Sequence, residues 1–582
     1  MGYGLLSILL VVAFPLEQVR LTESRWQENM QRDSAWVCSI TSQQALHNFR
    51  TTVGLYSAKE GGYDTFTKMG GWESSDCDLR GHAVGHLLSS YALFYAATGD
   101  SLFYLKGDSV VQGIRACQRV NGTGYVSAFP EGLIDRNIAG QSVWAPWYTL
   151  HKVMAGMLAQ YTYCHNDTAL AVVQDFAQWA ERKLKGLDDA TRRKMLRNEF
   201  GGMPEVWLDL YRLTGDEKAR WLTDFFYDNA KLDPLYEGNF DMGTMHTNTF
   251  LPKVIVESRK SKEESRKMAE QFFAHMLSHH VMAPGILSDK EHFFPEGTMY
   301  KHLSAYTGET CCTYNMLRMA RELYAHYPDI RYIQYMEQAL VNDILGQQDP
   351  ATGMVHYFLP MQTGAYKLYS TPMNSFWCCV GSSFESHAKY GENIYWHNSQ
   401  KSKVESQKHN DTVWVNLWIP SVLNWEEKGL RLRQETAFPR SNTTTLIVEQ
   451  APKHKITLMV RKDSTYQTVT RRFKKGDRIA VQREYALRTV AADGDASRVA
   501  LFYGPILLAG RLGQVDHPFS DPTKHNDYYT YDYQVPDSIK NVELKELQPV
   551  EGQFAEFITS DGIRVSPLYD IHHERYVVYW KK

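Results

Sequence analysis

The segment LDLYRLTGDEKARWLTDF, residues 208–225, contains the pattern on which the architecture of the first two thirds of the chain depends. Apolar side chains recur at helical spacing before and after a break at Thr214-Gly215-Asp216. Glycine ends a helix readily because it adopts left-handed backbone angles without strain, and an aspartate oxygen can accept hydrogen bonds from the first backbone N–H groups of the next helix. The segment therefore predicts two helices joined by a tight turn.

Similar turns recur along the chain, at Thr98-Gly99-Asp100, His165-Asn166-Asp167 and Tyr327-Pro328-Asp329. In each of them Gly, Asn or Pro stops one helix, and we expect the Asp to cap the next. The spacing implied by several of these turns is that of helix-pair repeats, about 45 to 60 residues, so roughly six hairpins fit between residues 20 and 390. Six helix pairs can close into an α/α toroid with a central pocket.

Beyond about residue 395 the hydrophobic pattern changes to period two, as in Thr412–Ile419 and Thr444–Val448. Short runs of β-branched residues separated by turn-forming clusters predict an antiparallel sandwich. We therefore divide the chain into a helical domain at 15–394, a β-sandwich domain at 395–511 and a β-rich C-terminal segment at 512–582.

Length and charge narrow the class of protein. At 582 residues the chain exceeds the roughly 250 to 300 at which one hydrophobic core stops growing, so at least two domains are expected. A net charge of −3 indicates neither a nucleic acid nor an anionic membrane as a partner.

One apolar run, Leu5–Phe14, has the length of a signal-peptide core, although no Lys or Arg precedes it. We therefore take residues 1–14 as a candidate signal segment and expect a periplasmic or secreted protein. No other stretch is long and apolar enough to predict a membrane span.

Four of the eight cysteines form two adjacent pairs, Cys311-Cys312 and Cys378-Cys379. Glu309 lies two residues before Cys311, so Glu309, Cys311, Cys378 and Cys379 offer one oxygen and three sulfur ligands, a set that suits Zn²⁺. Neither pair has the Cys-x-x-Cys spacing of a zinc ribbon, and buried free thiols or a conventional disulfide are the alternatives.

The sequence around these pairs resembles a known family. YTGETCCTYNMLRMAREL (306–323) and SFWCCVGSSFESHAKYG (375–391) resemble the Glu-Thr-Cys and Cys-Cys motifs of the β-L-arabinofuranosidases of glycoside hydrolase families 127 and 146, and family 146 is the closer. Further blocks agree in order, and the match spans nearly all of residues 14–511; these blocks are FPLEQVRL, RGHAVGHLLSSYALFYAATGD, WAPWYTLHKVMAGMLAQY, NEFGGMPEVWLDLYRLTGD and MHTNTFLPKV. The resemblance implies an (α/α)6 barrel catalytic domain at 15–394 followed by β-sandwich domains.

The resemblance also implies the chemistry. In the family, zinc is held at the positions that correspond to Glu309, Cys311, Cys378 and Cys379, and the cysteine at position 378 is the nucleophile of a retaining double displacement. The family places its acid/base in a Glu-x-Phe segment, which corresponds here to Glu291, with Glu296 as the competitor. Family 146 commonly has Asn at position 312, so Cys312 is not expected to bind the metal.

Several further residues are predicted to contact the sugar. His86, His151 and His246 match family positions in the barrel pocket, and the Trp144 and Trp147 rings are suited to stacking on a furanose. Glu385 resembles the acidic position that follows the Cys-Cys motif, where it can hydrogen-bond a sugar hydroxyl or support the metal ligands.

The function implied is a glycoside hydrolase, a β-L-arabinofuranosidase that releases terminal β-L-arabinofuranose from arabinose-containing plant oligo- or polysaccharides. One alternative is an enzyme of the same superfamily that acts on another pectic sugar, because one scaffold can host several specificities. The other is a non-catalytic carbohydrate-binding protein with a structural zinc. Retention of both Glu291 and Cys378 argues against the second alternative.

Overall fold

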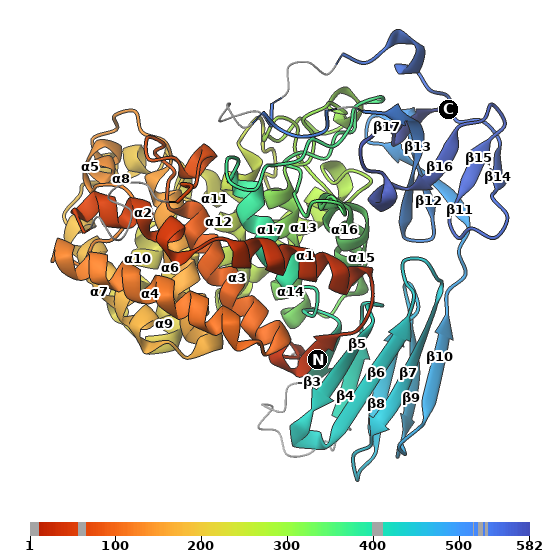
Figure 1. Cartoon of the computed structure of the whole chain (residues 1–582), viewed down its shortest axis with the longest axis horizontal. Coiled ribbons are helices and arrows are strands. Elements are labelled where there is room, and N and C mark those ends of the chain that lie inside the picture. The colour runs from red at the N-terminus through yellow and green to blue at the C-terminus, as the bar shows by residue number, and fades with distance from the viewer. Residues whose placement is uncertain (1–10, 56–65, 399–410, 516, 522–527, 530–533) are drawn as a thin grey trace, which may run out of the picture.

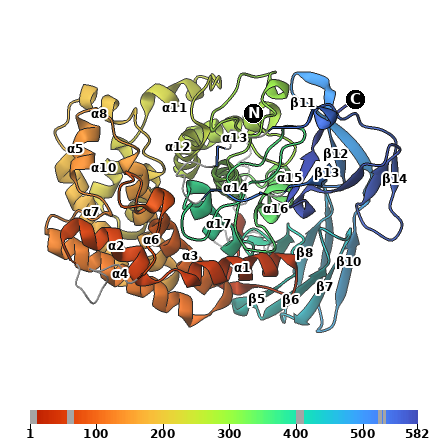
Figure 2. The same ribbon diagram turned by 45° about the horizontal axis from the view of Figure 1, so that its top comes forward.

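The structure is a computed structural model, and it describes residues 11–55, 66–398, 411–515, 517–521, 528–529 and 534–582. Helices fill one side of the molecule and three β-sheets fill the other (Figures 1 and 2). This order, helical first and β second, is the one that the sequence predicts. Within the described part of the chain, no helix combines the length and the apolar character needed to cross a bilayer.

Six helices form a closed inner ring in which each contacts the next and the last returns to the first. They are α3 (His82–Thr98), α6 (Pro146–Cys164), α9 (Met203–Thr214), α12 (Thr247–Arg259), α14 (Thr310–His326) and α17 (Cys378–Ala388). The predicted (α/α)6 barrel is therefore confirmed.

An outer layer covers this ring: α1 (Arg25–Ser39), α2 (Ser42–Val53), α4 (Ser101–Asn121), α7 (Asp167–Leu184), α10 (Glu217–Phe225), α13 (Glu263–His279) and α15 (Ile330–Ala339). The inner helix α3 is buried along nearly all of its length, whereas the outer α4 buries only one face. Shorter helices connect the layers: α5 (Gly132–Ile138), α8 (Asp189–Met195), α11 (Asn229–Tyr236), α16 (Leu345–Gln347) and a π-helical turn at Leu340–Ile344.

The predicted hairpin turns have the expected geometry. Gly99 and Gly215 end α3 and α9 in the left-handed conformation, and Asp100 and Asp216 cap α4 and α10 through their side-chain oxygens. One detail differs. Asn166, rather than the predicted Asp167, caps α7, because its amide oxygen already accepts from the backbone N–H of Ala169.

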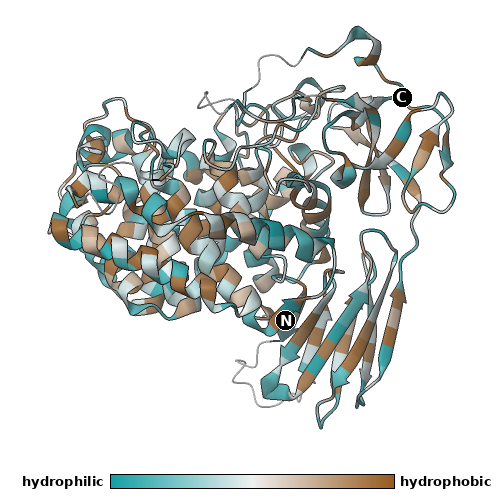
Figure 3. Cartoon of the chain, in the orientation of Figure 1, coloured by the Kyte–Doolittle hydropathy of each residue, from teal (hydrophilic) through white to brown (hydrophobic). Residues whose placement is uncertain are grey.

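Two five-stranded sheets lie beside the barrel and face each other as a sandwich (Figure 1). One contains β1 (Val11–Ala13), β3 (Tyr395–Asn398), β4 (Asp411–Val415), β8 (Ile456–Arg461) and β9 (Tyr466–Arg471). The other contains β10 (Arg478–Gln482), β7 (Thr443–Gln450), β6 (Leu430–Thr436), β5 (Ser421–Trp425) and β2 (Val19–Leu21). All pairs in the two sheets are antiparallel except β4 with β8. Buried residues alternate with exposed or partly exposed ones along β7, as the period-two pattern requires. Figure 3 shows hydrophobic and hydrophilic segments side by side on the strands of the sandwich.

The third sheet has eight strands and changes the predicted domain division. It joins β11 (Leu487–Ala492), β12 (Asp495–Tyr503) and β13 (Ile506–Gln514) to C-terminal strands, so residues 487–511 belong with the C-terminal region rather than with the sandwich. The predicted boundary is wrong because these strands pair with strands far along the chain, and the local hydrophobic pattern does not identify such partners. The C-terminal strands are β14 (Leu547–Pro549), β15 (Phe557–Thr559), β16 (Arg564–Pro567), β17 (Glu574–Val577) and β18 (Tyr579–Lys581).

A buried ion-pair cluster ties the sandwich to the outer layer of the barrel. The buried carboxylate of Glu337 on α15 pairs with Arg461 on β8 and with Arg483, whose Nη1 lies 2.9 Å from Glu337 Oε1. The strand Val11–Ala13, the described end of the candidate signal segment, pairs with β3, while residues 1–10 of that segment lie outside the described residues.

Candidate active site

The two cysteine motifs meet at the N-terminal ends of two neighbouring inner helices. Cys378 is the first residue of α17, and Glu309 immediately precedes α14, which contains Cys311 in its first turn. The first backbone N–H groups of a helix have no partner within it, and its dipole is positive at that end. Both properties favour thiolates and carboxylates, so this end of the barrel suits an anionic cluster.

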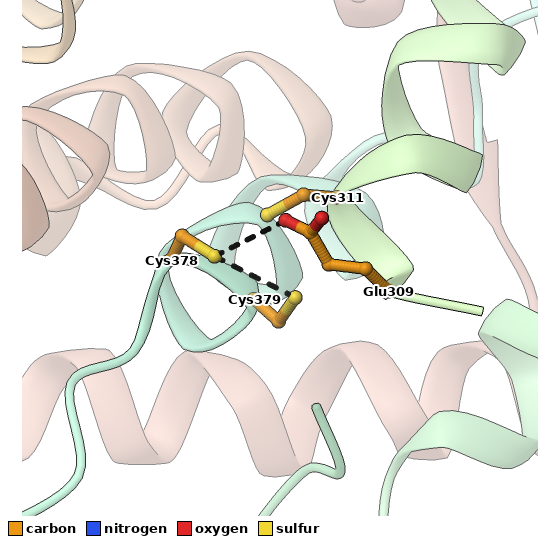
Figure 4. Close-up of side chains that lie close together, drawn as sticks. All are labelled: Glu309, Cys311, Cys378 and Cys379. Atoms are coloured by element: carbon orange, nitrogen blue, oxygen red, sulfur yellow. Dashed lines mark hydrogen bonds between the residues drawn. The ribbon is translucent and has the colours of Figure 1, made fainter. Parts of the chain in front are cut away.

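Glu309, Cys311, Cys378 and Cys379 form one buried cluster, with one ligand atom from each residue lying within 4.8 Å of all the others. Figure 4 shows the four side chains pointing toward a common centre from the N-terminal ends of α14 and α17. The Cys378 sulfur lies 3.4 Å from Glu309 Oε1 and 3.8 Å from the Cys379 sulfur. The eight cysteines are all free thiols, so the disulfide alternative is excluded.

The pKa values of the four groups are shifted in different directions. Burial, followed by the charge of Cys311, raises the pKa of Glu309 well above its ordinary value. Burial and the hydrogen bonds to Cys311 likewise raise the pKa of Cys378 and Cys379. At Cys311 burial acts in the same direction, but hydrogen bonds from Cys378, Cys379 and Ser382 outweigh it and hold the pKa well below that of an ordinary thiol.

This cluster fits a metal ion. Three sulfurs and one carboxylate oxygen, all buried and convergent, are the donor set of a tetrahedral Zn²⁺ site. Without a cation, ionisation of all four groups would place several negative charges together away from water, which is unfavourable. Cys312 lies outside the four: its sulfur is 3.6 Å from Glu309 Oε2, and burial raises its pKa.

Glu291 lies in a loop opposite this cluster, with a backbone φ of 70° that places it in the left-handed region. Such strain at a non-glycine residue costs free energy and is found most often at functional sites. The backbone oxygen of Glu291 accepts from the N–H of Thr247, at the start of α12. The loop is therefore attached to the same end of the barrel as the cysteines.

Both carboxylate oxygens of Glu291 accept hydrogen bonds from tyrosines. Tyr357 donates to Oε1 at 2.5 Å, and Tyr529 donates to Oε2 at 2.8 Å. The Tyr357 oxygen also lies 3.3 Å from the Cys378 sulfur. A single hydroxyl group thus separates the predicted acid/base from the predicted nucleophile.

Of the predicted histidines, His246 lies nearest to this pair. Its Nε2 is 4.0 Å from Glu291 Oε2, and its Nδ1 accepts from the Thr249 N–H as the N-cap of α12. The ring remains partly exposed and can reach a ligand.

His86, His151 and Glu385 lie deeper in the barrel. His86 Nδ1 is 2.6 Å from Glu385 Oε1, and Tyr314 donates to the other oxygen of Glu385. Burial opposes ionisation of Glu385, but the His86 hydrogen bond and charge outweigh it and lower the pKa to about 2. His151 accepts from the Gly202 N–H at 3.1 Å, and burial keeps it neutral by lowering its pKa.

His151 and Glu385 also line a cavity of about 390 Å³ that extends toward the C-terminal ends of the inner helices, away from Cys378. Within the described chain, the side-chain hydrogen bonds of His86, His151 and Glu385 reach neither Glu291 nor Cys378. Their predicted contact with the sugar stays a prediction.

Trp147 does not lie in the site as its predicted sugar contact requires. Its side chain is only 1% exposed and packs against Trp179 and Phe226 in the core. The reason is helical geometry: Trp147 lies in the first turn of α6 on the face toward the outer helices, whereas Trp144, before the helix begins, is 41% exposed. Trp144 packs edge-on against Trp72, which contacts Tyr357.

Three residues of this site were not predicted from the sequence: Tyr357, Tyr528 and Tyr529. No local motif marks any of them. The Tyr528 ring stacks on the Tyr357 ring at 4.1 Å between centroids, although 171 positions separate the two in the numbering. The Tyr-Tyr doublet within an otherwise polar stretch is the one signal available at 528–529.

Comparison with known proteins agrees with this geometry. A family model described as the β-L-arabinofuranosidase GH127 catalytic domain matches residues 18–392, and the GH127 middle-domain model matches residues 412–464. Comparison with curated proteins finds no match.

Two solved structures illustrate the likeness of the fold. A GH127 β-arabinofuranosidase has a TM-score of 0.72 and 15% identity over 99% of this chain and 98% of that one. A GH127 β-L-arabinofuranosidase from Geobacillus stearothermophilus T6 has a TM-score of 0.68 and 15% identity over 97% of this chain and 99% of that one.

Proposed function

Because the chain belongs to the GH127 family of β-L-arabinofuranosidases and is a glycoside hydrolase, we propose that it releases terminal β-L-arabinofuranose from arabinose-containing plant glycans with retention of configuration. Cys378 is the nucleophile and Glu291 the acid/base. The single observation that carries this proposal is the Tyr357 hydroxyl, 2.5 Å from Glu291 and 3.3 Å from Cys378. Such closeness of acid and nucleophile is typical of retaining glycosidases.

The first step forms a thioglycoside. The Cys378 thiolate attacks the anomeric carbon while Glu291 donates its proton to the departing glycosidic oxygen, so the carbon–oxygen bond breaks as the carbon–sulfur bond forms. In the second step Glu291 takes a proton from water, whose oxygen attacks the same carbon and releases Cys378 as the thiolate. Two inversions give net retention.

Glu309, Cys311, Cys378 and Cys379 would hold a zinc ion. The bound ion would supply positive charge that keeps the Cys378 sulfur ionised despite the burial that raises its pKa. Tyr357 contacts both reacting side chains and therefore holds Glu291 over the sulfur. His246, at the partly exposed rim, is placed to hydrogen-bond a sugar hydroxyl.

The stereochemistry of the first product tests the proposal. Proton NMR during the first minutes of hydrolysis of an aryl β-L-arabinofuranoside should show the β-anomer, and added methanol should yield the methyl β-glycoside. If Glu291 instead activated water directly, the α-anomer would appear first and Cys378 would not be the nucleophile.

Two variants test the roles separately. Cys378→Ser should lose turnover on every substrate, whereas Glu291→Gln should recover part of the first step when the leaving group is so acidic that it needs little protonation. A matched control is Glu296→Gln, which changes the competing carboxylate that pairs with His275 outside the site. Turnover by Glu296→Gln should equal that of the wild type. If it were lost instead, the acid/base assignment would be wrong.

A further inference from the structure

We infer that the C-terminal region contributes directly to the catalytic centre: Tyr529 positions the acid/base Glu291, and Tyr528 forms an aromatic wall of the sugar site. The inference rests on the proposed function and deepens it. Both tyrosines come from residues 512–582, which lie C-terminal to both matched family models. The barrel alone would then hold an incomplete site.

The contacts of Glu291 carry the first half of the inference. Its loop begins after α13, and its backbone is held at a positive φ, but its side chain is fixed by two hydroxyl groups from different parts of the chain. Tyr357 donates a hydrogen bond to Oε1, and Tyr529 donates one to Oε2. A carboxylate that lacked the second donor could rotate about its own bonds and would lose its alignment with the departing oxygen. Tyr529 is therefore a positioning residue for proton transfer.

The role inferred for Tyr528 rests on its packing. Its side chain is 7% exposed and stacks on Tyr357 with 22° between the ring planes. It also contacts Trp72 and Trp377, the residue that precedes the nucleophile. An aromatic face at this position can pack against the apolar face of a furanose, because sugar C–H groups and π-systems attract each other. Trp72 continues the aromatic surface to the exposed Trp144.

Substitution of each tyrosine should have a different effect on the kinetics. Loss of the Tyr529 hydroxyl should harm proton donation, and so should depend on the leaving group. Loss of the Tyr528 ring should weaken binding of the sugar itself, and so should not depend on the leaving group. A residue that merely supported the fold would affect both substrates through the amount of folded enzyme.

The experiment uses the full chain and two glycosides of one sugar, with 4-nitrophenol and methanol as leaving groups. For Tyr529→Phe we expect kcat/KM to fall about tenfold or more on the methyl glycoside and by less than about threefold on the 4-nitrophenyl glycoside. For Tyr528→Leu we expect KM to rise about tenfold on both substrates with kcat nearly unchanged. The matched control is Tyr327→Phe, which removes a surface hydroxyl that donates to Glu263 at 2.6 Å.

Failure of the inference differs from failure of the proposed function. If the wild type cleaves another sugar in preference to β-L-arabinofuranosides, the proposed substrate is wrong, and the same leaving-group comparison is made with the preferred sugar. If Tyr529→Phe matches Tyr327→Phe on both substrates, or loses equal activity on both, Tyr529 does not position the acid. An unchanged KM in a folded Tyr528→Leu would overturn the role of that ring.

Discussion

Zinc binding to the metal-free protein should release about three protons near neutral pH. Burial holds the pKa of Cys378, Cys379 and Glu309 above their ordinary values, so we count all three as protonated before the metal binds. The hydrogen bonds that Cys311 accepts lower its pKa, so we count Cys311 as ionised before the metal binds. Each ligand must be deprotonated when it coordinates, so three protons leave and none comes from Cys311.

The number of protons released on zinc binding determines how steeply the apparent zinc affinity depends on pH. Each proton displaced makes the apparent Kd fall about tenfold per pH unit, so three protons give about a thousandfold per unit. Cys379→Ser removes one ionisable ligand, and the slope should fall to about a hundredfold per unit. Absolute affinity should fall as well, since a thiolate ligand is lost.

Titration calorimetry in two buffers of different ionisation enthalpy measures the proton count directly. Cys164→Ser is the matched control, because Cys164 is a buried free thiol at the end of α6 that does not belong to the cluster. The Cys164→Ser variant should release as many protons on zinc binding as the wild type. A wild-type release of one proton or fewer, or an equal slope in wild type and Cys379→Ser, would refute the protonation states deduced from the structure.

Two further predictions concern stability. Trp147→Ala should lower the free energy of unfolding by about 3–5 kcal/mol and leave KM unchanged in the folded fraction, because the Trp147 side chain is buried in the core. Trp144→Ala should change the free energy of unfolding by less than about 1 kcal/mol. Thermal melts and kinetics measure both quantities, and a raised KM in Trp147→Ala would contradict the assignment of Trp147 to the core. Burial lowers the pKa of His280 to about 4, so its contribution to stability is complete above the ordinary histidine value and is lost as the pH falls toward 4. Between pH 7 and 5 the wild type should therefore lose about 2 kcal/mol more than His280→Leu in denaturant titrations, and parallel losses would show that His280 is not buried in its neutral form.

Helical hairpins were predictable because their signals are local. A glycine or asparagine that ends one helix and a side chain that caps the next lie within three residues, as at Gly215 and Asp216. The run Thr412–Ile419 shows the limit of such reasoning. Its strand ends at Val415, because the chain then turns to begin β5 at Ser421 in the opposite sheet. Strand pairing is set by partners far along the chain, and local alternation does not identify them.

The same distinction applies to the site. The four residues of the cysteine cluster could be found from sequence because two short segments hold them, each at the start of a helix. Tyr357 and Tyr529 could not, because each contributes one hydroxyl from a segment without helix or strand. Trp147 was misassigned because an aromatic ring suited to stacking on a sugar packs equally well in the core, and the residue type does not say which face of the helix it occupies.

The division of the site between two helix ends and one loop has a chemical reason. Three thiolates and a carboxylate around a divalent cation leave a net charge of −2, and the N-termini of α14 and α17 offset part of it with their dipoles. The acid/base must give its proton to the departing oxygen, and a direct hydrogen bond to that anionic cluster would compete for the same proton. Tyr357 separates the two by one neutral hydroxyl, so Glu291 can be held close to the Cys378 sulfur without accepting a bond from it. Replacing Tyr357 would therefore disturb both partners at once, whereas Tyr529 contacts the acid alone.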